Sequence, residues 1–246
     1  MNKYVRNGLI GAFWIFVWWI AARSVGLPLL LPGPVDTLSA LFQQVKTAAF
    51  WQSTGLTLLR VGIGYLTAVG IGVVMAVICH FVPVMDALFS PIRSVIKATP
   101  VSSFIILVLL WISKGTVPAF ISFLMVLPMI WTAVQEALRA TDAQLLEMTR
   151  AYRFTPTQRL RYLYAPSVKP GLAASCITGL GFAWKSGIAA EVIALPLFSV
   201  GTNLYNAKIY LESADLFAWT FTVILLSIAL EALLKKALNR LKGGAA

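Results

Sequence analysis

Long apolar stretches separated by short polar segments dominate the chain. Six of them follow one another, at residues 8–22, 54–81, 95–112, 117–134, 171–195 and 216–234. Most approach or exceed the roughly 20 residues with which an α-helix crosses a bilayer. Lipid offers no hydrogen-bond partners to the backbone, so such spans are helical, and the alternation typical of a β-barrel is absent. The pattern predicts an all-α, polytopic membrane helix bundle of about six transmembrane helices.

Two departures from plain spans are visible in this pattern. A proline-rich segment ends the first stretch, and residues 35–51 then have an amphipathic pattern, so we expect a helix at the outer membrane interface. Pro91 and Pro100 lie at the start of the third stretch. Because proline interrupts helical hydrogen bonding, we expect the first part of this element to be kinked or interfacial.

Glycine is frequent in the second stretch, at Gly55, Gly62, Gly64, Gly70 and Gly72. Small residues let neighbouring helices approach closely in lipid, which predicts tight packing of this helix within the bundle. A mobile helix that lines a pore is the alternative interpretation.

The composition supports membrane insertion along the whole chain. Hydrophobic residues make up 59% and charged residues 12% of the 246 positions, whereas a soluble domain carries about 25% charged residues. The length leaves no room for a separate soluble domain, so we predict a single transmembrane domain over residues 1–246. The N-terminal stretch contains Trp18 and Trp19 and no small-x-small cleavage site, which indicates an uncleaved first span.

The net charge of +11 is distributed unevenly. One set of predicted connections and ends carries Lys3, Arg6, Arg139, Arg150, Arg153, Arg159, Arg161, Lys169, Lys235, Lys236, Arg240 and Lys242, and the other carries only Arg23, Lys46, Lys114 and Lys208. Since cytoplasmic loops are enriched in Lys and Arg, both termini and a loop at about 136–170 are predicted to be cytoplasmic. This asymmetry explains the charge without nucleic-acid binding.

The basic loop contains a spaced motif. Glu147-Met148-Thr149 is followed at fixed distances by Arg153, Leu163 and Ala165-Pro166. This spacing resembles the "EAA" loop of ABC importer permeases, in which Glu-Ala-Ala is followed by Gly, Ile and Leu-Pro. Arg153 stands where that family has glycine. Because glycine adopts dihedral angles that other residues reach only at a cost, we expect the local turn to differ here.

Further motifs extend the resemblance from about residue 53 to the last span. Thr57-Leu58-x-Arg60 with Gly64 looks like the opening of the family's core span. Trp184, followed by Ala189-Ala190-Glu191 and then Gly201, is similar to the nitrate/sulfonate/taurine/bicarbonate branch of binding-protein-dependent permeases. The resemblance implies the type I ABC importer permease fold.

The resemblance also implies a function and a set of partners. The chain would be the membrane-spanning subunit of an importer in the bacterial inner membrane, forming the translocation path for a small anion or a thiamine-precursor-like solute. Its partners would be a cytoplasmic ABC ATPase dimer, a second permease copy in a homodimer, an extracytoplasmic solute-binding protein and the lipid bilayer. It would bind no cofactor itself, since ATP and Mg would bind to the ATPase.

The residues of the loop fit a role in coupling. Asp142 can cap a short helix with an apolar strip formed by Leu145, Leu146, Met148, Thr149 and Tyr152. Such a helix can dock into a groove of a partner or lie on anionic lipid. With the family motif, the predicted coupling residues are Leu145, Glu147, Met148, Thr149, Arg150, Tyr152, Arg153, Leu163 and Pro166.

Among the ionisable residues within spans, three are candidates for function: Arg60, Lys185 and Glu191. Charges at membrane depth are costly and mark candidate functional positions. They are predicted either to form a structural ion-pair network or to line the translocation path, with Lys185 the stronger candidate for contact with an anionic solute. Lys185 and Glu191 are six positions apart and so are poorly aligned on one helix face.

Catalysis by this chain is not predicted. The sequence has no P-loop and a single histidine, His80, and the two cysteines, Cys79 and Cys176, lack metal or redox spacing. A non-catalytic transport subunit is therefore favoured over a membrane enzyme. The main alternative is a self-contained, ion-coupled secondary transporter, although the inverted repeats typical of that class are not visible.

Overall fold

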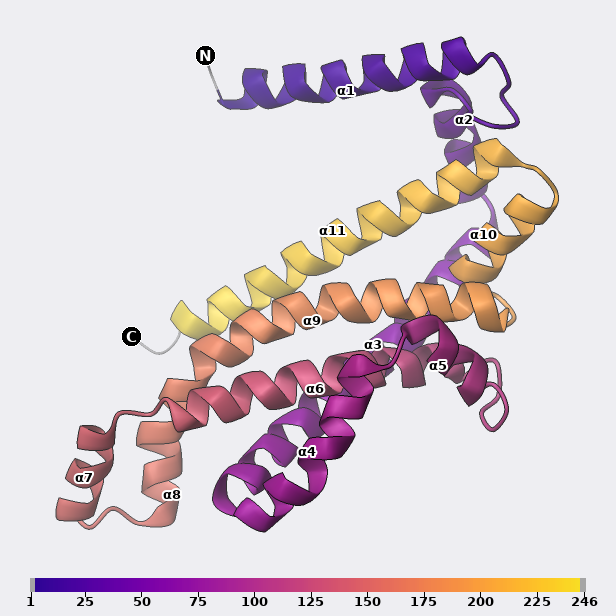
Figure 1. Cartoon of the computed structure of the whole chain (residues 1–246). Coiled ribbons are helices and arrows are strands. Elements are labelled where there is room, and N and C mark those ends of the chain that lie inside the picture. Colours follow the sequence, from indigo (N-terminus) through magenta and orange to yellow (C-terminus); the bar gives the residue numbers. More distant parts are fainter. Residues whose placement is uncertain (1–2, 244–246) are drawn as a thin grey trace. The chain divides into compact units, whose positions relative to one another are not determined.

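The computed structural model describes residues 3–243, and the described part consists of helices and their connections (Figure 1). The side chains of Lys3 and Lys242, used above for the topology, lie outside the described part. The chain groups into two compact units, Met1–Thr57 with Leu195–Leu226, and Leu58–Ala194 with Ser227–Ala246. They are called unit 1 and unit 2 below. The single domain expected over residues 1–246 stays a prediction.

Unit 1 contains α1 (Lys3–Val25), α2 (Pro34–Val45), α10 (Val200–Ile209) and the first parts of α3 (Ala48–Phe81) and α11 (Ser213–Gly243). Helix α2 begins at Pro34, a position at which proline is preorganised and its missing N–H is not needed. The amphipathic helix expected at 35–51 is confirmed up to Val45. Beyond that residue the expectation is wrong, because the chain turns and α3 begins at Ala48.

Aromatic contacts hold unit 1 together. Phe50 stacks on Trp219 with ring centroids 5.1 Å apart, and both contact the buried Val200. The Val200 N–H donates to Thr57 Oγ1 over 3.0 Å. Thr57, part of the motif that resembles the opening of the permease core span, thus caps the start of α10.

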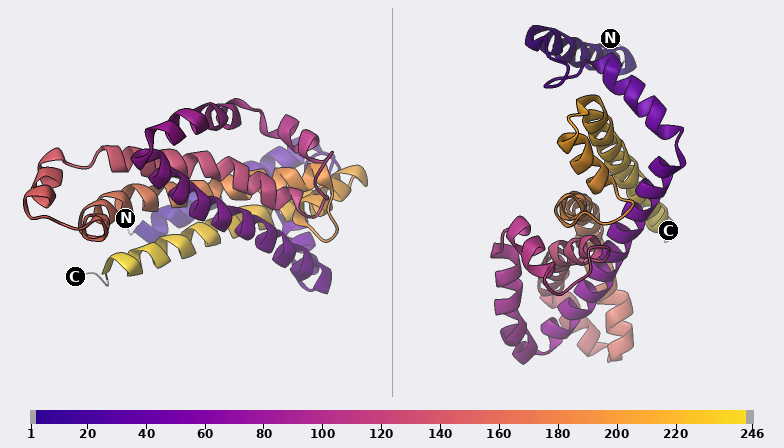
Figure 2. Two further views of the ribbon diagram at one scale, coloured as in Figure 1. Left: turned by 90° about the horizontal axis from the view of Figure 1, so that it is seen from below. Right: turned by 90° about the vertical axis from the view of Figure 1, so that its right-hand side faces the viewer.

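Unit 2 is built on two long helices, α6 (Val117–Arg139) and α9 (Ala165–Ala194), which lie side by side (Figures 1 and 2). Around them are the rest of α3 and the shorter α4 (Pro83–Ala98), α5 (Val101–Val108), α7 (Ala143–Ala151) and α8 (Pro156–Arg159), and a π-helical turn, η1 (Leu160–Tyr164), leads into α9. Hydrogen bonds also link α6 to α9: Ser122 Oγ donates to the Ala183 carbonyl over 3.0 Å.

Two glycines set the helix separations in unit 2. A Cβ atom on Gly64 of α3 would lie 2.1 Å from the Ala119 carbonyl oxygen of α6, and one on Gly187 of α9 would lie 2.5 Å from Val61. Neither approach is possible with a side chain, so glycine permits the contact. Gly55, Gly62 and Gly70 of α3 have no neighbour within 4 Å of such an atom. Tight packing therefore accounts for only part of the glycine content of α3.

Four described helices, α1, α3, α6 and α11, are long and apolar enough to cross a membrane. A fifth span results if α4 and α5, bent by 106° at Thr99–Pro100, are taken together. The kink expected from Pro100 is confirmed, and the stretch 95–112 is not one straight helix. The predicted fifth span corresponds to α9, which has 30 residues. It is not among those helices, because Lys185, Glu191 and many small residues lower its hydropathy.

Candidate functional site

The predicted coupling segment forms a short helix, α7, outside the long helices of unit 2. Asp142 Oδ1 accepts the Gln144 N–H over 2.8 Å, so the predicted N-cap is confirmed. Thr149 is 2% exposed, whereas Leu145 and Met148 are 44% and 43% exposed. The apolar strip of α7 is therefore only partly covered by its own chain.

Helix α7 ends in a left-handed turn. Arg153 has φ of +52°. Its N–H donates to the Arg150 carbonyl over 3.0 Å, and the Phe154 N–H donates to the Thr149 carbonyl over 2.9 Å. This is the Schellman arrangement, in which glycine is usual. The expectation that arginine would prevent an unusual conformation here is wrong. Two hydrogen bonds hold Arg153 in the left-handed region, which costs a side-chain-bearing residue about 1–2 kcal/mol.

A groove lies between α7 and η1. It has a volume of about 380 Å³ and is lined by Leu145, Met148, Thr149, Phe154, Tyr162 and Leu163. Leu163 is buried, and the Ala165 N–H closes the π turn on the Leu160 carbonyl, directly before Pro166, which has no N–H to donate. The structure thus brings together four of the predicted coupling residues. The others, Glu147, Arg150, Tyr152, Arg153 and Pro166, are exposed and do not line the groove.

A polar cluster that the sequence did not reveal joins α4 to α6. Asp86 accepts from Gln135 Nε2 and from Arg139 Nη2, each over 2.8 Å, and lies 3.9 Å from Arg93. The Arg93 guanidinium in turn lies over the Trp131 ring. The cluster is fixed to the last turns of α6, directly before α7. Its members are about 40–50 positions apart in sequence, so no local pattern indicates the contact.

Arg60 and Glu191, two of the ionisable residues expected within spans, contact each other. Arg60 Nη1 lies 3.4 Å from Glu191 Oε1, with side-chain exposures of 17% and 0%. This contact between α3 and α9 fits the structural ion pair considered above. A place for Arg60 and Glu191 in the translocation path stays a prediction.

Lys185, on the same helix as Glu191, is exposed. It lines an open cavity of about 650 Å³ in unit 2, together with Lys97. Within residues 3–243, Lys185 has no carboxylate at ion-pair distance. Lys185 therefore does not pair with Glu191. It lines the same cavity as Lys97, a residue that was not predicted from the sequence.

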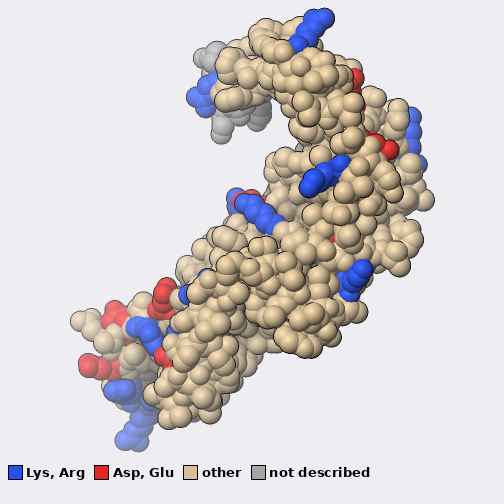
Figure 3. All heavy atoms as spheres, turned by 45° about the vertical axis from the view of Figure 1, so that its right-hand side comes forward, with Lys and Arg blue, Asp and Glu red and all other residues tan. Residues whose placement is uncertain are grey.

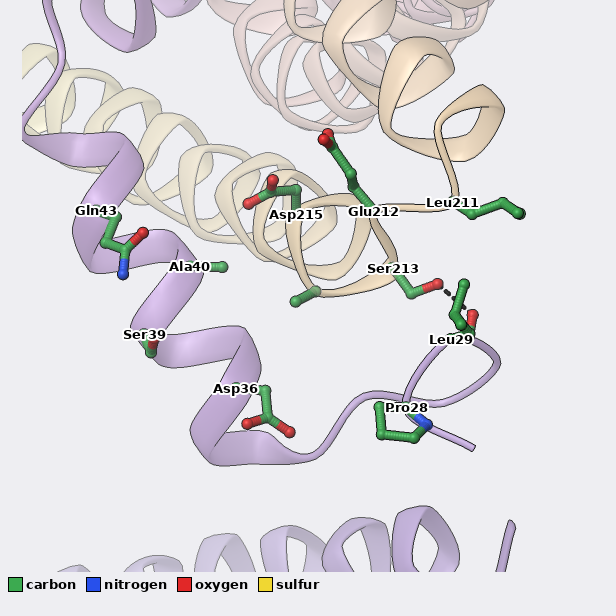
Figure 4. A pocket seen from close by; sticks show the side chains of 11 residues that line it. Pro28, Leu29, Asp36, Ser39, Ala40, Gln43, Leu211, Glu212, Ser213 and Asp215 are labelled. Carbon is green, nitrogen blue, oxygen red and sulfur yellow. Dashed lines mark hydrogen bonds between the residues drawn. The ribbon is translucent and has the colours of Figure 1, made fainter. Parts of the chain in front are cut away.

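Unit 1 has a cavity of its own, with a different character. It has a volume of about 480 Å³, and Asp36, Glu212 and Asp215 are among its lining residues (Figure 4). Asp215 accepts from Gln44 Nε2 over 2.8 Å, and Ser213 donates to the Leu29 carbonyl. Among the described residues, no group of three His, Cys, Asp or Glu side chains has a geometry that could hold a metal ion.

Most of the surface in view in Figure 3 carries no charged side chain.

The described residues thus combine apolar helices long enough to cross a membrane with a short helical loop, as a polytopic membrane protein does. Residues 68–242 match the family of binding-protein-dependent transport system inner membrane components, and the chain belongs to this family. It is a permease subunit of an ABC importer, with the type I permease fold. It is a multi-pass protein of the inner membrane.

Three relatives support this assignment. The taurine transport system permease protein TauC of Escherichia coli (strain K12) is 22% identical, over 92% of this chain and 84% of its own length. The riboflavin transport system permease protein RibX of Chloroflexus aurantiacus is 28% identical, over 89% and 85%. The putative aliphatic sulfonates transport permease protein SsuC of Bacillus subtilis (strain 168) is 21% identical, over 87% and 78%. The predicted family, fold and transport function are thus confirmed, and a transport subunit agrees with the expected non-catalytic role.

Proposed function

We propose that two copies of this chain form the permease of an importer for a small organic anion. In this proposal, helix α7 of each copy docks on a cytoplasmic ABC ATPase dimer, which binds ATP and Mg and drives the transport cycle. The permease itself performs no chemistry and holds no cofactor. Two of the three relatives described above are named for taurine or sulfonates, solutes that carry a sulfonate group, which supports a solute with an anionic head.

The partly exposed strip of α7 is the observation that carries the coupling role. Leu145 and Met148 border the groove against η1, and the groove is flanked by exposed charged residues such as Glu147 and Arg150. An apolar strip on a short helix within a polar loop is typical of docking into a partner groove. Since each side chain is already more than half buried, covering the rest contributes about 1 kcal/mol each. The Asp86 cluster would hold the last turns of α6, which directly precede α7, in a fixed position against α4.

Replacement of Met148 tests this role. In the assembled complex, Met148→Asp should reduce ATPase retention on the permease at least tenfold and abolish solute-stimulated ATP hydrolysis, because it places a charge in the docked strip. Gln144→Asp is the matched control: it adds the same charge to an exposed position of the same helix outside the groove. Full retention and stimulation with Met148→Asp would rule out α7 as the coupling element.

The solute-binding protein would then contact the opposite side of the membrane. If the termini are inside, the acidic cavity of unit 1 would lie on the outer side, and its lining residues Asp36 and Glu212 would face a basic surface of that partner. Glu212→Lys should raise the concentration of binding protein that gives half-maximal stimulation of ATP hydrolysis. An unchanged concentration would remove this cavity from the docking surface and leave the α7 test unaffected.

A further inference from the structure

The bend between α4 and α5 opens on the cavity of unit 2 that contains Lys97 and Lys185. Its lining residues are Ile96, Lys97, Thr99, Val101, Met125, Pro128, Met129, Phe182, Lys185, Ser186 and Ala189, and no Asp or Glu is among them. Lys97 Nζ donates to the neutral Thr132 Oγ1 over 2.9 Å. Two lysines thus share one cavity whose lining includes no compensating carboxylate.

The N-terminus of α5 faces the same cavity, since Thr99 and Val101 both line it. Pro100 is the N-cap of α5 and provides no side-chain cap, so the first N–H groups of the helix lack intrahelical acceptors. Such N–H groups, together with the positive end of the helix dipole, bind anions well. The start of α5 therefore adds N–H donors to the two lysines, beside the C-terminal end of α4, whose Lys97 and Thr99 also line the cavity.

The remaining walls are apolar. Met125, Met129 and Phe182 contribute most of the large side chains, and Ser186 adds a hydroxyl group. The volume of about 650 Å³ lies within the range of small-molecule sites. This combination suits a compact solute with one negatively charged head and a small apolar body. It does not suit a cation, because two lysines and no Asp or Glu line the site.

Glu191 does not explain the position of Lys185. The Glu191 carboxylate already contacts Arg60, on another helix. A lysine within a span costs a few kcal/mol unless water or an anion compensates its charge. In the empty state, water in the cavity would compensate the charge of Lys185. In the loaded state, the solute anion would do so.

We propose that this cavity is a binding station on the translocation path, where Lys97, Lys185 and the N-terminus of α5 hold the sulfonate or carboxylate head of the solute. This inference rests on the proposed function and names the substrate class and the residues that select it. Lys97 was not among the path residues expected from the sequence, and it lies in the last turn of α4, directly before the bend at Pro100.

The test measures the charge preference of the cavity without knowledge of the solute. A cysteine replaces Ala189, an exposed lining residue, in a full-length complex in which the buried Cys79 and Cys176 are changed to alanine. The probes are 2-sulfonatoethyl and 2-trimethylammonioethyl methanethiosulfonate, which differ in charge. Their rate ratio at position 189, relative to free cysteine, should favour the anionic reagent.

Lys97→Met and Lys185→Met should each lower this ratio roughly tenfold, because one nearby positive charge acts in opposite directions on the two reagents. Lys97→Arg and Lys185→Arg should retain it, which separates charge from packing. Ala174→Cys is the control, since Ala174 is exposed on α9 but does not line the cavity, and its ratio should not respond. A ratio at position 189 that stays constant in both methionine variants would overturn the station. So would the absence of reaction with either reagent, because a solute needs the same access.

The same variants distinguish this inference from the proposed function. Lys97→Met and Lys185→Met lie outside α7, so ATPase retention should equal that of the unmodified complex. An unchanged ratio with normal retention would reject the station alone. A ratio that falls as expected in the two methionine variants, together with ATPase retention that Met148→Asp leaves unaffected, would reject the coupling role alone.

Discussion

At the scale of single residues, one glycine sets the distance between α3 and α6. Gly64→Ala should lower the melting temperature of the purified protein by several degrees, because the new methyl group would lie 2.1 Å from a backbone oxygen that cannot move alone. Gly62→Ala, two positions away on the helix face that has open space, should leave the melting temperature unchanged or raise it, since alanine favours the helix. Equal melting temperatures for the two variants would contradict the close contact.

The left-handed residue at the end of α7 permits a second test. Arg153→Gly should preserve the turn, because glycine adopts positive φ without strain. Arg153→Val should open it, since a β-branched residue is strongly disfavoured there. Hydrogen exchange of the Phe154 amide, which donates to Thr149, reports the opening. Exchange in Arg153→Val should be about fivefold faster than in Arg153→Gly. Equal rates would mean that the two hydrogen bonds do not depend on the conformation of residue 153.

Residue-scale prediction succeeded where the determinant is local. The Asp142 cap follows from a side chain and an amide two positions apart, and it is present. The conformation of Arg153 is equally local, yet the expectation failed. It considered only that arginine disfavours positive φ, and not the two hydrogen bonds that close the end of α7 and stabilise this conformation. The contact between Arg60 and Glu191 joins positions 131 apart, and only the fold brings them together.

At the scale of elements, the ion pair between α3 and α9 is testable by a double-mutant cycle. Arg60→Met should destabilise the protein strongly, by about 3–5 kcal/mol, because it leaves the buried Glu191 carboxylate without its cationic partner. Adding Glu191→Gln should recover most of the loss. Thermal unfolding of the two single variants and the double variant measures this coupling.

The matched control is Lys185→Met, on the same helix as Glu191. Its small effect on stability should not change when Glu191→Gln is added, because the structure places the two side chains in different surroundings. If Glu191→Gln rescued Lys185→Met but not Arg60→Met, the pairing described here would be incorrect.

The sequence predicted elements well where hydrophobicity alone decides. Helices α1, α3, α6 and α11 correspond to four expected apolar stretches. Proline correctly marked the bend between α4 and α5, but not its angle or the cavity beside it, which also depends on α6 and α9. The π turn at Leu160–Tyr164 had no signal, since its distinguishing hydrogen bond shifts the register by one residue within an otherwise helical segment.

At the scale of the whole molecule, motifs at fixed spacing predicted the protein family better than any single segment did. The loop spacing from Glu147 to Pro166 and the later motifs indicated the importer family, which the match over residues 68–242 establishes. The same spacing could not reveal the Asp86 cluster or the place of Lys97 in the cavity lining. Both depend on which helix faces which, and this is set by contacts such as that of Gly64 with α6.

The orientation of the chain in the membrane is the remaining whole-molecule prediction. It follows from the concentration of Lys and Arg in the central loop and at the C-terminal end. In a background without Cys79 and Cys176, cysteines at the exposed positions Lys114 and Lys208 should react with an impermeant maleimide added outside spheroplasts. A cysteine at the exposed Arg161 should react only after permeabilisation, which also shows that the site itself is reactive. The result decides more than orientation, because an ATPase can reach α7 only from the cytoplasm. Labelling of position 161 from outside would place α7 on the wrong side, and no docking of that helix on the ATPase would then be possible.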